Sequence, residues 1–442
     1  MIDAKKSCDK SIENHIIGIM DPNSFSFRAA LEELFSHMNF AIPWRGKTHH
    51  LRTRRILCRP YNTLEAVSTC SAILNRGTHW NPHHNSFFSI VQDDTYLLND
   101  TLSYKSVDAN SAYGQIKRLG LRVPRTWAIP QEDYSDWYER RSFHLDLIFS
   151  EHELFDLAAI GDCVGYPAYL KPQGKGFGLA VKRVENTDEL FQAYRELAKG
   201  PVNLQRAVEW EESIKTLGIG PQTYPMHYNP EAVFPHNRYL RSSDRAVDFF
   251  FLKEKECSEA RRLCKIINAL YNWDHNCCEI LLDGQGNLWP IDFANAYPNT
   301  MLTSLHFYFP EVVKAMVKWL TFNAVNSRKK PEHYRSSWPR FREVYEKSKR
   351  DAWSYESLLI AYEELADEHF ATAEFEDFCQ RALGGFDERA LEYFESEDFD
   401  EIILRKCQRY FEQEHEIPQM VEHYRGIHRF WCYCERERLG LL

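Results

Sequence analysis

A lysine followed by three spaced glycines is the feature of this sequence with the clearest chemical meaning. The apolar run Tyr166 to Lys171 leads into a loop that contains Gly174, Gly176 and Gly178. Glycines let backbone N–H groups approach phosphate oxygens, and a lysine at the end of a strand adds positive charge beside them. The pattern predicts a polyphosphate-binding loop. It matches neither a Walker loop, which ends in Gly-Lys-Ser/Thr, nor a dinucleotide-binding fingerprint.

Two carboxylates on a predicted hairpin form a second candidate site. The apolar segments 277–282 and 288–293 are separated by a glycine-containing turn, so Glu279 and Asp292 can lie on one face, with Asn295 just beyond. Carboxylate and amide oxygens suit Mg²⁺, which shares its remaining positions with water and nucleotide phosphates. The alternative is that Glu279 is a solvated strand residue and that Asp292 caps the following turn.

The elements expected to hold these residues alternate between strands and helices. Residues 179–184 form another apolar run, so the glycine loop joins two strands as a hairpin flap. The N-terminal part begins with a strand-like run and a capped helix, whereas the last part shows apolar residues at helical spacing. We therefore expect an α/β fold with three domains. They are an N-terminal α/β domain (1–104), a central α+β domain (105–310, flap subdomain about 125–204) and a helical C-terminal domain (311–442).

Composition limits the classes of function. The chain has 442 residues, of which 44% are hydrophobic, and a net charge of −10, which argues against nucleic acid as a main partner. It shows neither a secretory leader nor a long uncharged apolar run, so we expect a cytoplasmic protein without a membrane segment. The 12 cysteines lack a Cys-x-x-Cys pair and are expected to be reduced core thiols rather than a metal cluster.

The order of these parts resembles the ATP-grasp superfamily of carboxylate-amine ligases. The resemblance spans about residues 105–310, and the N-terminal part fits the family's usual preceding domain. It implies ATP and Mg²⁺ as cofactors, and an enzyme that activates a carboxylate as an acyl phosphate and joins it to an amine. The segments that carry it are Gly120-Leu-Arg-Val-Pro124, Tyr169-Leu-Lys-Pro172, the loop 174–181, the strand around Gln205, Lys215 to Gly220, and Ile291 to Asn299.

The resemblance also implies roles for individual residues. The implied nucleotide-binding residues are Lys171, Gly174, Lys175, Gly176, Phe177, Gly178, Gln205, Arg206, Val208, Glu211 and Glu212. The implied magnesium ligands are Glu279, Asp292 and Asn295, and the implied catalytic cations are Lys215 with Arg238 or Arg241. The family usually ends its site with Glu-x-Asn. This chain has Asp292-Phe-Ala-Asn295, one residue longer, so Asn299 is a rival for the third ligand.

Substrate contacts are expected in a polar loop of the N-terminal domain. The loop of residues 75–85 is dense in hydrogen-bonding groups, and its candidates are Arg76, His79, Asn81, His83 and His84. The alternative is a polar surface loop with capping asparagines. The basic segment 45–59 either attracts an acidic substrate or phosphate, or forms a solvated face. The expected substrates are a small carboxylate and an amine, such as amino acids or peptide-like molecules.

Two other classes of function stay open at this point. One is a degenerate nucleotide-binding regulatory protein that uses ATP without ligation, which the altered Asp-x-x-Asn spacing allows. The other is an ATP-dependent kinase on the same scaffold. The helical C-terminal part either covers the active site, mediates association of identical chains, or binds a partner.

Overall fold

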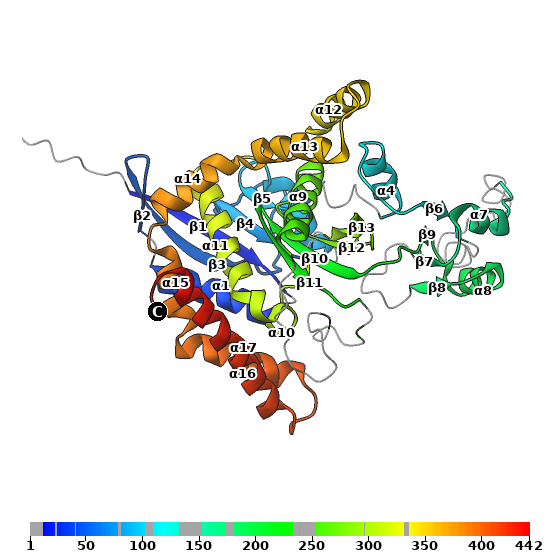
Figure 1. Ribbon diagram of the computed structural model, residues 1–442. Helices are drawn as coiled ribbons and strands as arrows, with labels where there is room; N and C mark the ends of the chain where they lie inside the picture. The colour runs from blue at the N-terminus through cyan, green and yellow to red at the C-terminus, as the bar shows by residue number, and fades with distance from the viewer. Residues whose placement is uncertain are drawn as a thin grey trace, which may run out of the picture. The chain divides into compact units, whose positions relative to one another are not determined.

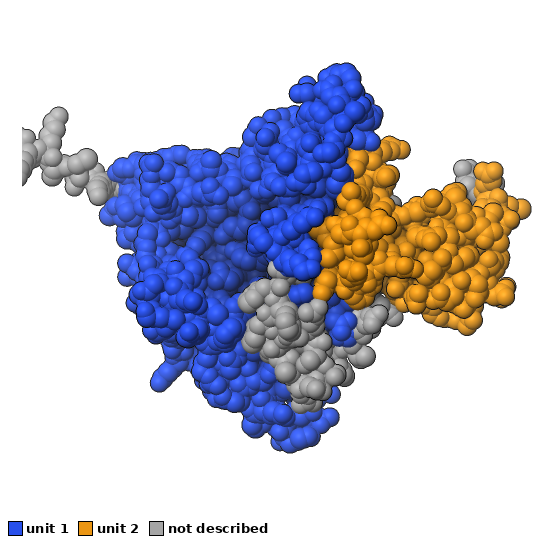
Figure 2. Space-filling view, in the orientation of Figure 1, with its two compact units in different colours: residues 1–105, 214–277, 295–442 blue, residues 106–213, 278–294 orange. Residues whose placement is uncertain are grey.

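The computed structural model (Figure 1) forms two compact units, which Figure 2 distinguishes by colour. Unit 1 consists of residues 1–105, 214–277 and 295–442, and unit 2 of residues 106–213 and 278–294. Each unit contains more than one stretch of chain, and the three consecutive domains expected from the sequence stay a prediction. The structure describes residues 12–22, 24–39, 41–77, 81–101, 109–131, 153–172, 181–230, 232, 238, 253–295, 297–330 and 336–442.

A five-stranded sheet forms the N-terminal part of unit 1 and confirms the α/β architecture expected there. Its order is β2-β3-β1-β4-β5, with β1 parallel to β3 and β4, and only the β2 to β3 pair antiparallel. Helices α1, α2 and α11 pack beside it. The bounds are β1 Ile12–Met20, α1 Phe25–Met38, β2 Ala41–Trp44, β3 Lys47–Arg55, β4 Ala72–Asn75, α2 Pro82–Val91, β5 Tyr96–Leu98 and α11 Phe309–Val325.

Unit 2 contains an antiparallel sheet in the order β6-β9-β7-β8. Its core joins sheet residues such as Leu170 and Leu204 to Val164 of α7 and Leu190 of α8. The predicted hairpin is confirmed, because β7 pairs with β8 and Leu170 lies opposite Lys182. The bounds are α4 Ala109–Lys117, β6 Thr126–Ile129, α7 Leu157–Val164, β7 Ala168–Pro172, β8 Lys182–Val184, α8 Thr187–Leu197 and β9 Val202–Arg206.

A third sheet has the strand order β11-β10-β12-β13. Strands β12 and β13 are neighbours, as expected from their sequence. The turn between them closes because Asp283 N donates to Asn287 O at 3.0 Å. The bounds are β10 Glu212–Ile219, β11 Gln222–His227, α9 Glu254–Tyr271, β12 His275–Leu282 and β13 Leu288–Asn295.

The C-terminal part of unit 1 is helical throughout its described residues, which confirms the expected extension. Its aromatic side chains, including Phe378, Phe394 and Trp431, are buried. No helix of the described residues is long and apolar enough to cross a membrane. The bounds are α10 Leu302–Leu305, the 3₁₀ helix η2 His306–Tyr308, α12 Trp338–Arg350, α13 Tyr355–Phe370, α14 Thr372–Ala382, α15 Phe386–Phe394, α16 Glu397–Tyr410 and α17 Ile417–Arg438.

Candidate nucleotide site

Lys171 lies at the centre of a polar cluster in unit 2. On β7 it follows Tyr169 by two residues, and Tyr169 lies opposite Gln205 of β9, so Lys171 and Gln205 are diagonal neighbours on one face. Lys171 Nζ donates to Gln205 Oε1 at 2.7 Å and to Ile291 O at 3.4 Å. Gln205 is 1% exposed. Its amide donates to Thr126 Oγ1 at 2.9 Å, so a buried and anchored amide positions the ammonium group.

Tyr113 of α4 belongs to the same cluster, although the sequence pattern did not identify it. Its hydroxyl donates to Ile291 O, the carbonyl that also accepts from Lys171. Its ring meets the edge of Phe293, with ring centres 5.4 Å apart and an interplanar angle of 84°. The carbonyl of Ile291 therefore ties β13 to both α4 and β7.

The two predicted metal-binding carboxylates act electrostatically on this cluster. Burial lowers the pKa of the Lys171 ammonium, and the negative charges of Asp292 and Glu279 oppose that shift. Burial raises the pKa of the Tyr113 hydroxyl, and both carboxylates raise it further. Because both carboxylates influence both residues, the lysine and the acidic pair occupy one neighbourhood of unit 2.

Glu279 and Asp292 offer a suitable donor set for Mg²⁺. They lie on the neighbouring strands β12 and β13, where Glu279 is half-buried and Asp292 is exposed. Hard oxygen ligands that water can reach match the preference of Mg²⁺ for one or two carboxylates plus water and phosphate. Glu279 and Asp292 are therefore the two residues on which the proposed Mg²⁺ site depends.

The third ligand stays a prediction, because the structure gives both asparagines other hydrogen bonds. In a regular strand, side chains three residues apart point to opposite faces, so Asn295 does not share the face of Asp292. Its Oδ1 accepts from Tyr297 N at 3.3 Å. Asn299 accepts from Met301 N at 3.0 Å and donates to Ser304 Oγ at 2.8 Å.

The remaining predicted nucleotide residues are less closely connected to the cluster. Arg206, at the end of β9, and Glu211 are exposed, whereas Val208 and Glu212 are half-buried. Glu211 N donates to Leu282 O at 2.8 Å, which joins the segment before β10 to the end of β12. The nucleotide roles of these four residues stay predictions. The loop residues Gly174, Lys175, Gly176, Phe177 and Gly178 lie outside the described residues.

Two of the predicted catalytic cations, Lys215 and Arg238, both contact Tyr228 in unit 1. The sequence patterns did not identify Tyr228. Lys215, on β10, is 6% exposed, and its Nζ lies over the Tyr228 ring at 4.4 Å from the centroid. Arg238 Nη1 donates to the Tyr228 hydroxyl at 3.2 Å. An aromatic face can hold a cation in this way while leaving its N–H groups directed elsewhere. Arg241 lies outside the described residues.

The polar loop of unit 1 contains a helix cap. Asn81 Oδ1 accepts from His83 N at 3.1 Å and from His84 N at 3.2 Å, and Pro82 occupies the first turn of α2. This is the capping alternative considered for the asparagines. The exposed His83 hydrogen-bonds Arg59 O at 2.8 Å, and His84 is buried. His79 lies outside the described residues.

Arg76, the other predicted substrate residue, is 6% exposed and is surrounded by protein groups. Its guanidinium donates to Asp21 Oδ2 at 3.1 Å and to Pro298 O at 2.9 Å. It also lies 2.8 Å from His275 Nε2. Burial and the charge of Arg76 place the pKa of His275 well below its ordinary value, so the histidine is neutral. These contacts give Arg76 a structural role and lend no support to its predicted contact with a substrate.

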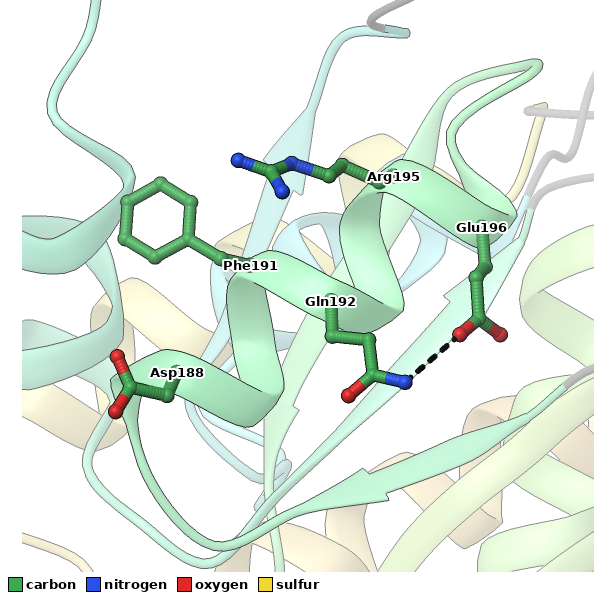
Figure 3. Close-up of a pocket in the computed structure, with 5 residues that line it drawn as sticks. All are labelled: Asp188, Phe191, Gln192, Arg195 and Glu196. Atoms are coloured by element: carbon green, nitrogen blue, oxygen red, sulfur yellow. Dashed lines mark hydrogen bonds between the residues drawn. The ribbon is translucent and has the colours of Figure 1, made fainter.

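A surface hollow elsewhere in unit 2 contains none of the predicted residues. Figure 3 shows its five lining side chains, all of which come from helix α8: Asp188, Phe191, Gln192, Arg195 and Glu196. Gln192 Nε2 donates to Glu196 Oε1 at 3.2 Å. Because one helix face supplies every lining residue, the hollow does not enclose a ligand.

Comparison with known proteins yields structural likeness only. No family model matches the chain, and no curated protein does. Among solved structures, a RimK-domain ATP-grasp protein from Sphaerobacter thermophilus is 16% identical, with 69% of this chain and 99% of that chain covered and a TM-score of 0.43.

Two further structures match to a similar extent. A RiPP-associated ATP-grasp ligase from Chryseobacterium gregarium, in complex with ADP and with a leader and core peptide, is 12% identical, with coverages of 70% and 97% and a TM-score of 0.43. The VanG D-Ala:D-Ser ligase from Enterococcus faecalis is 13% identical, with coverages of 71% and 99% and a TM-score of 0.45. At these scores the matches alone assign no site or reaction. The chain is similar to ATP-grasp ligases, the family that its order of motifs resembles.

Proposed function

We propose that this protein is an ATP-dependent carboxylate-amine ligase of the cytoplasm. The observation that carries the proposal is the cluster in unit 2, where anchored Lys171 lies in the field of Glu279 and Asp292. A lysine held beside two carboxylates suits a polyphosphate with bound Mg²⁺. The carboxylate oxygens bind the metal ion, and the lysine and the metal ion together offset the negative charge of the polyphosphate. The order of motifs along the chain supports the same assignment.

The proposed reaction has two steps. A carboxylate oxygen of the substrate attacks the γ-phosphorus of ATP. The bond between the γ-phosphorus and the β,γ-bridging oxygen breaks, ADP departs, and the substrate becomes an acyl phosphate. The nitrogen of an amine then attacks the carbonyl carbon. The carbon–oxygen bond to phosphate breaks, the nitrogen loses a proton, and an amide and inorganic phosphate are formed. Such transfers depend mainly on positioning and electrostatic stabilisation.

The chain's own residues would divide this work. Lys171, held by Gln205, would bind the phosphate side of the nucleotide, and Glu279 and Asp292 would hold Mg²⁺. When bound, the metal ion would neutralise phosphate charge. We assign Lys215 and Arg238 to the charge of the acyl phosphate, with Tyr228 restricting their positions. The substrates are proposed to be small, an amino acid or peptide-like carboxylate and an amine.

An ADP-release screen tests the proposal. Purified protein is incubated with Mg-ATP and with pairs drawn from amino acids, small peptides and dicarboxylates, and products are identified by mass spectrometry. The proposal expects release that requires both a carboxylate and an amine, and a product whose mass is that of the two substrates minus water. Lys171→Ala and Asp292→Asn should each reduce the rate of release by a factor of about 10² or more, whereas Lys182→Ala, on the neighbouring strand β8, should not.

The other outcomes identify the alternatives. A phosphorylated product that is stable to added amine would identify a kinase. ADP binding without turnover on any substrate pair would identify a regulatory protein. Release at the parent rate by both Lys171→Ala and Asp292→Asn would mean that the cluster in unit 2 is not the nucleotide site.

A further inference from the structure

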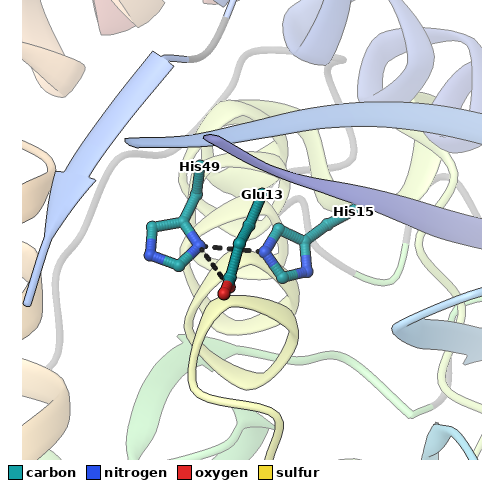
Figure 4. A group of neighbouring side chains, drawn as sticks. All are labelled: Glu13, His15 and His49. Atoms are coloured by element: carbon teal, nitrogen blue, oxygen red, sulfur yellow. Dashed lines mark hydrogen bonds and ion pairs between the residues drawn. The ribbon is translucent and has the colours of Figure 1, made fainter. Parts of the chain in front are cut away.

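Three side chains that can bind a metal ion lie together at the start of strands β1 and β3 in unit 1, as Figure 4 shows. Glu13 of β1 lies opposite His49 of β3 in the parallel pair. His15 follows Glu13 by two residues and so shares its face. The register of two neighbouring strands therefore brings the three side chains together.

The three ligand atoms all lie within 4.8 Å of one another. His15 Nε2 lies 2.9 Å from His49 Nδ1, and that nitrogen lies 3.5 Å from Glu13 Oε2. Ligands about 2.0 to 2.1 Å from a tetrahedral zinc ion are about 3.3 Å apart. Small side-chain adjustments would place all three atoms around one cation.

The surroundings hold the ligand atoms in place. His15 Nδ1 hydrogen-bonds Ser71 Oγ at 3.1 Å, which directs Nε2 toward the cluster, as outer partners do for metal-bound histidines. Lys47 pairs with Glu13 Oε1, while Oε2 faces His49. His15 is 6% exposed and His49 is 3% exposed, whereas Glu13 is partly exposed and gives solvent ions access.

Hydrogen bonds within the cluster leave one of its buried polar atoms without a partner among the described residues. That atom is His49 Nε2. The 2.9 Å between His15 Nε2 and His49 Nδ1 has room for one N–H, so one nitrogen donates to the other. A cation would bind His15 Nε2, His49 Nδ1 and Glu13 Oε2 at once, and it would leave His49 Nε2 as the N–H of that ring.

We propose that Glu13, His15 and His49 bind one divalent transition-metal ion, of which zinc fits the nitrogen and carboxylate ligands best. Because the protein supplies three ligands, a water molecule can be the fourth ligand of the ion, on the solvent-exposed side of Glu13. The site lies where parallel strands begin. Ligand sites of α/β sheets lie at the opposite, carboxyl ends. The ion would therefore join β1 to β3, and this inference does not depend on the proposed ligase activity.

Competition with a chromophoric chelator tests the proposal on the full chain, after dialysis against EDTA. Added Zn²⁺ should bind with one tight equivalent per chain. Glu13→Gln should weaken binding at least about tenfold, Ser71→Ala by about tenfold, and His49→Ala should remove the tight equivalent. His50→Ala, whose side chain lies on the other face of β3, is the matched control and should retain it.

A further variant separates this site from the proposed magnesium site. Asp292→Asn should retain the tight zinc equivalent, because it belongs to a different cluster. If His49→Ala does not fold, Glu13→Gln decides the matter, since Glu13 is partly exposed and its replacement leaves the core unchanged. Absence of a tight equivalent in the parent protein, or equal affinity in the parent and Glu13→Gln, would overturn the proposal.

Discussion

Two cations of this molecule, the buried Arg76 and the half-buried Lys171, have opposite surroundings. Arg76 in unit 1 contacts a carboxylate, a carbonyl and a neutral histidine at 2.8 to 3.1 Å, and lies 5.4 Å from the centre of the Phe27 ring. Lys171 in unit 2 donates to one amide and more distantly to one carbonyl, while two carboxylates on neighbouring strands act on it through space. The Arg76 guanidinium therefore has several close protein partners, whereas the Lys171 ammonium has one close partner, the amide of Gln205.

The difference supports a structural role for Arg76 and agrees with the ligand-binding role that we propose for Lys171. A guanidinium with several partners inside the protein links the chain segments that supply them, here around residues 21, 275 and 298. An ammonium positioned by a buried amide keeps its charge available for phosphate oxygens. We therefore base the proposed role of Lys171 on the number and kind of its partners, and not on its burial.

The largest expected effect is on stability, at Arg76. Arg76→Met leaves Asp21 without the guanidinium and should lower the free energy of unfolding by about 3 to 5 kcal/mol, measured by urea denaturation. Arg52→Ala, at an exposed position of β3, should change it by less than about 0.5 kcal/mol. If Arg76→Met is as stable as the parent but no longer acts on substrate, Arg76 is a substrate residue and the comparison fails.

Lys171 should show the reverse pattern. Lys171→Ala removes a preorganised cation and should reduce the rate of ADP release by a factor of about 10² or more, with little change in unfolding free energy. Lys182→Ala on β8 is the matched control, because its side chain is exposed and pairs with Glu196. Loss of stability without loss of rate would show that Lys171 is structural.

The anchor of Lys171 gives a smaller effect. Gln205→Met keeps the volume but removes the acceptor for the ammonium and the donor to Thr126, so ADP release should fall about tenfold. Gln205→Glu retains an acceptor and should restore part of the rate. Equal losses in both variants would argue that packing, and not the hydrogen bond to Lys171, explains the effect.

The smallest expected effect concerns acid stability in the Arg76 cluster. The pKa of His275 is lowered in the folded state, so its contribution to stability is complete above the ordinary pKa of about 6.5 and is lost as the pH falls. Between pH 6.5 and 5.5 this loss is about 1 kcal/mol. Urea denaturation at pH 6.5 and pH 5.5 gives the free energy of unfolding at each pH. Between these values His275→Gln should lose about 1 kcal/mol less of it than the parent protein does. An identical pH dependence would mean that folding does not lower the pKa of His275.

Local patterns predicted most of the fold. The hairpins β7–β8 and β12–β13 and the helical C-terminal part follow from turn residues and from apolar periodicity, which act between neighbours in sequence. The lysine and the two carboxylates of the candidate site were predicted in the same way. Their convergence on one neighbourhood agrees with the hairpin geometry.

The contacts that complete the site could not be predicted from those patterns, although Gln205 itself was named as a nucleotide-binding residue. Tyr113 reaches Ile291 O across 178 residues of sequence, and Gln205 reaches Thr126 across 79. Such contacts depend on how distant elements pack, which periodicity does not encode. The same limit applies to Arg76, whose type and loop position suggested substrate binding but whose partners come from distant segments.

The most direct test of the central claim is the effect of Mg²⁺ on ADP affinity, measured by calorimetric titration of the full chain with and without the metal ion. If Glu279 and Asp292 hold a nucleotide-bound Mg²⁺ beside Lys171, the metal should strengthen ADP binding in the parent protein. That gain should disappear in Asp292→Asn and Glu279→Gln, whereas Asp188→Asn, on the surface of α8, should retain it. An equal gain from Mg²⁺ in the parent and in both carboxylate variants would contradict the account.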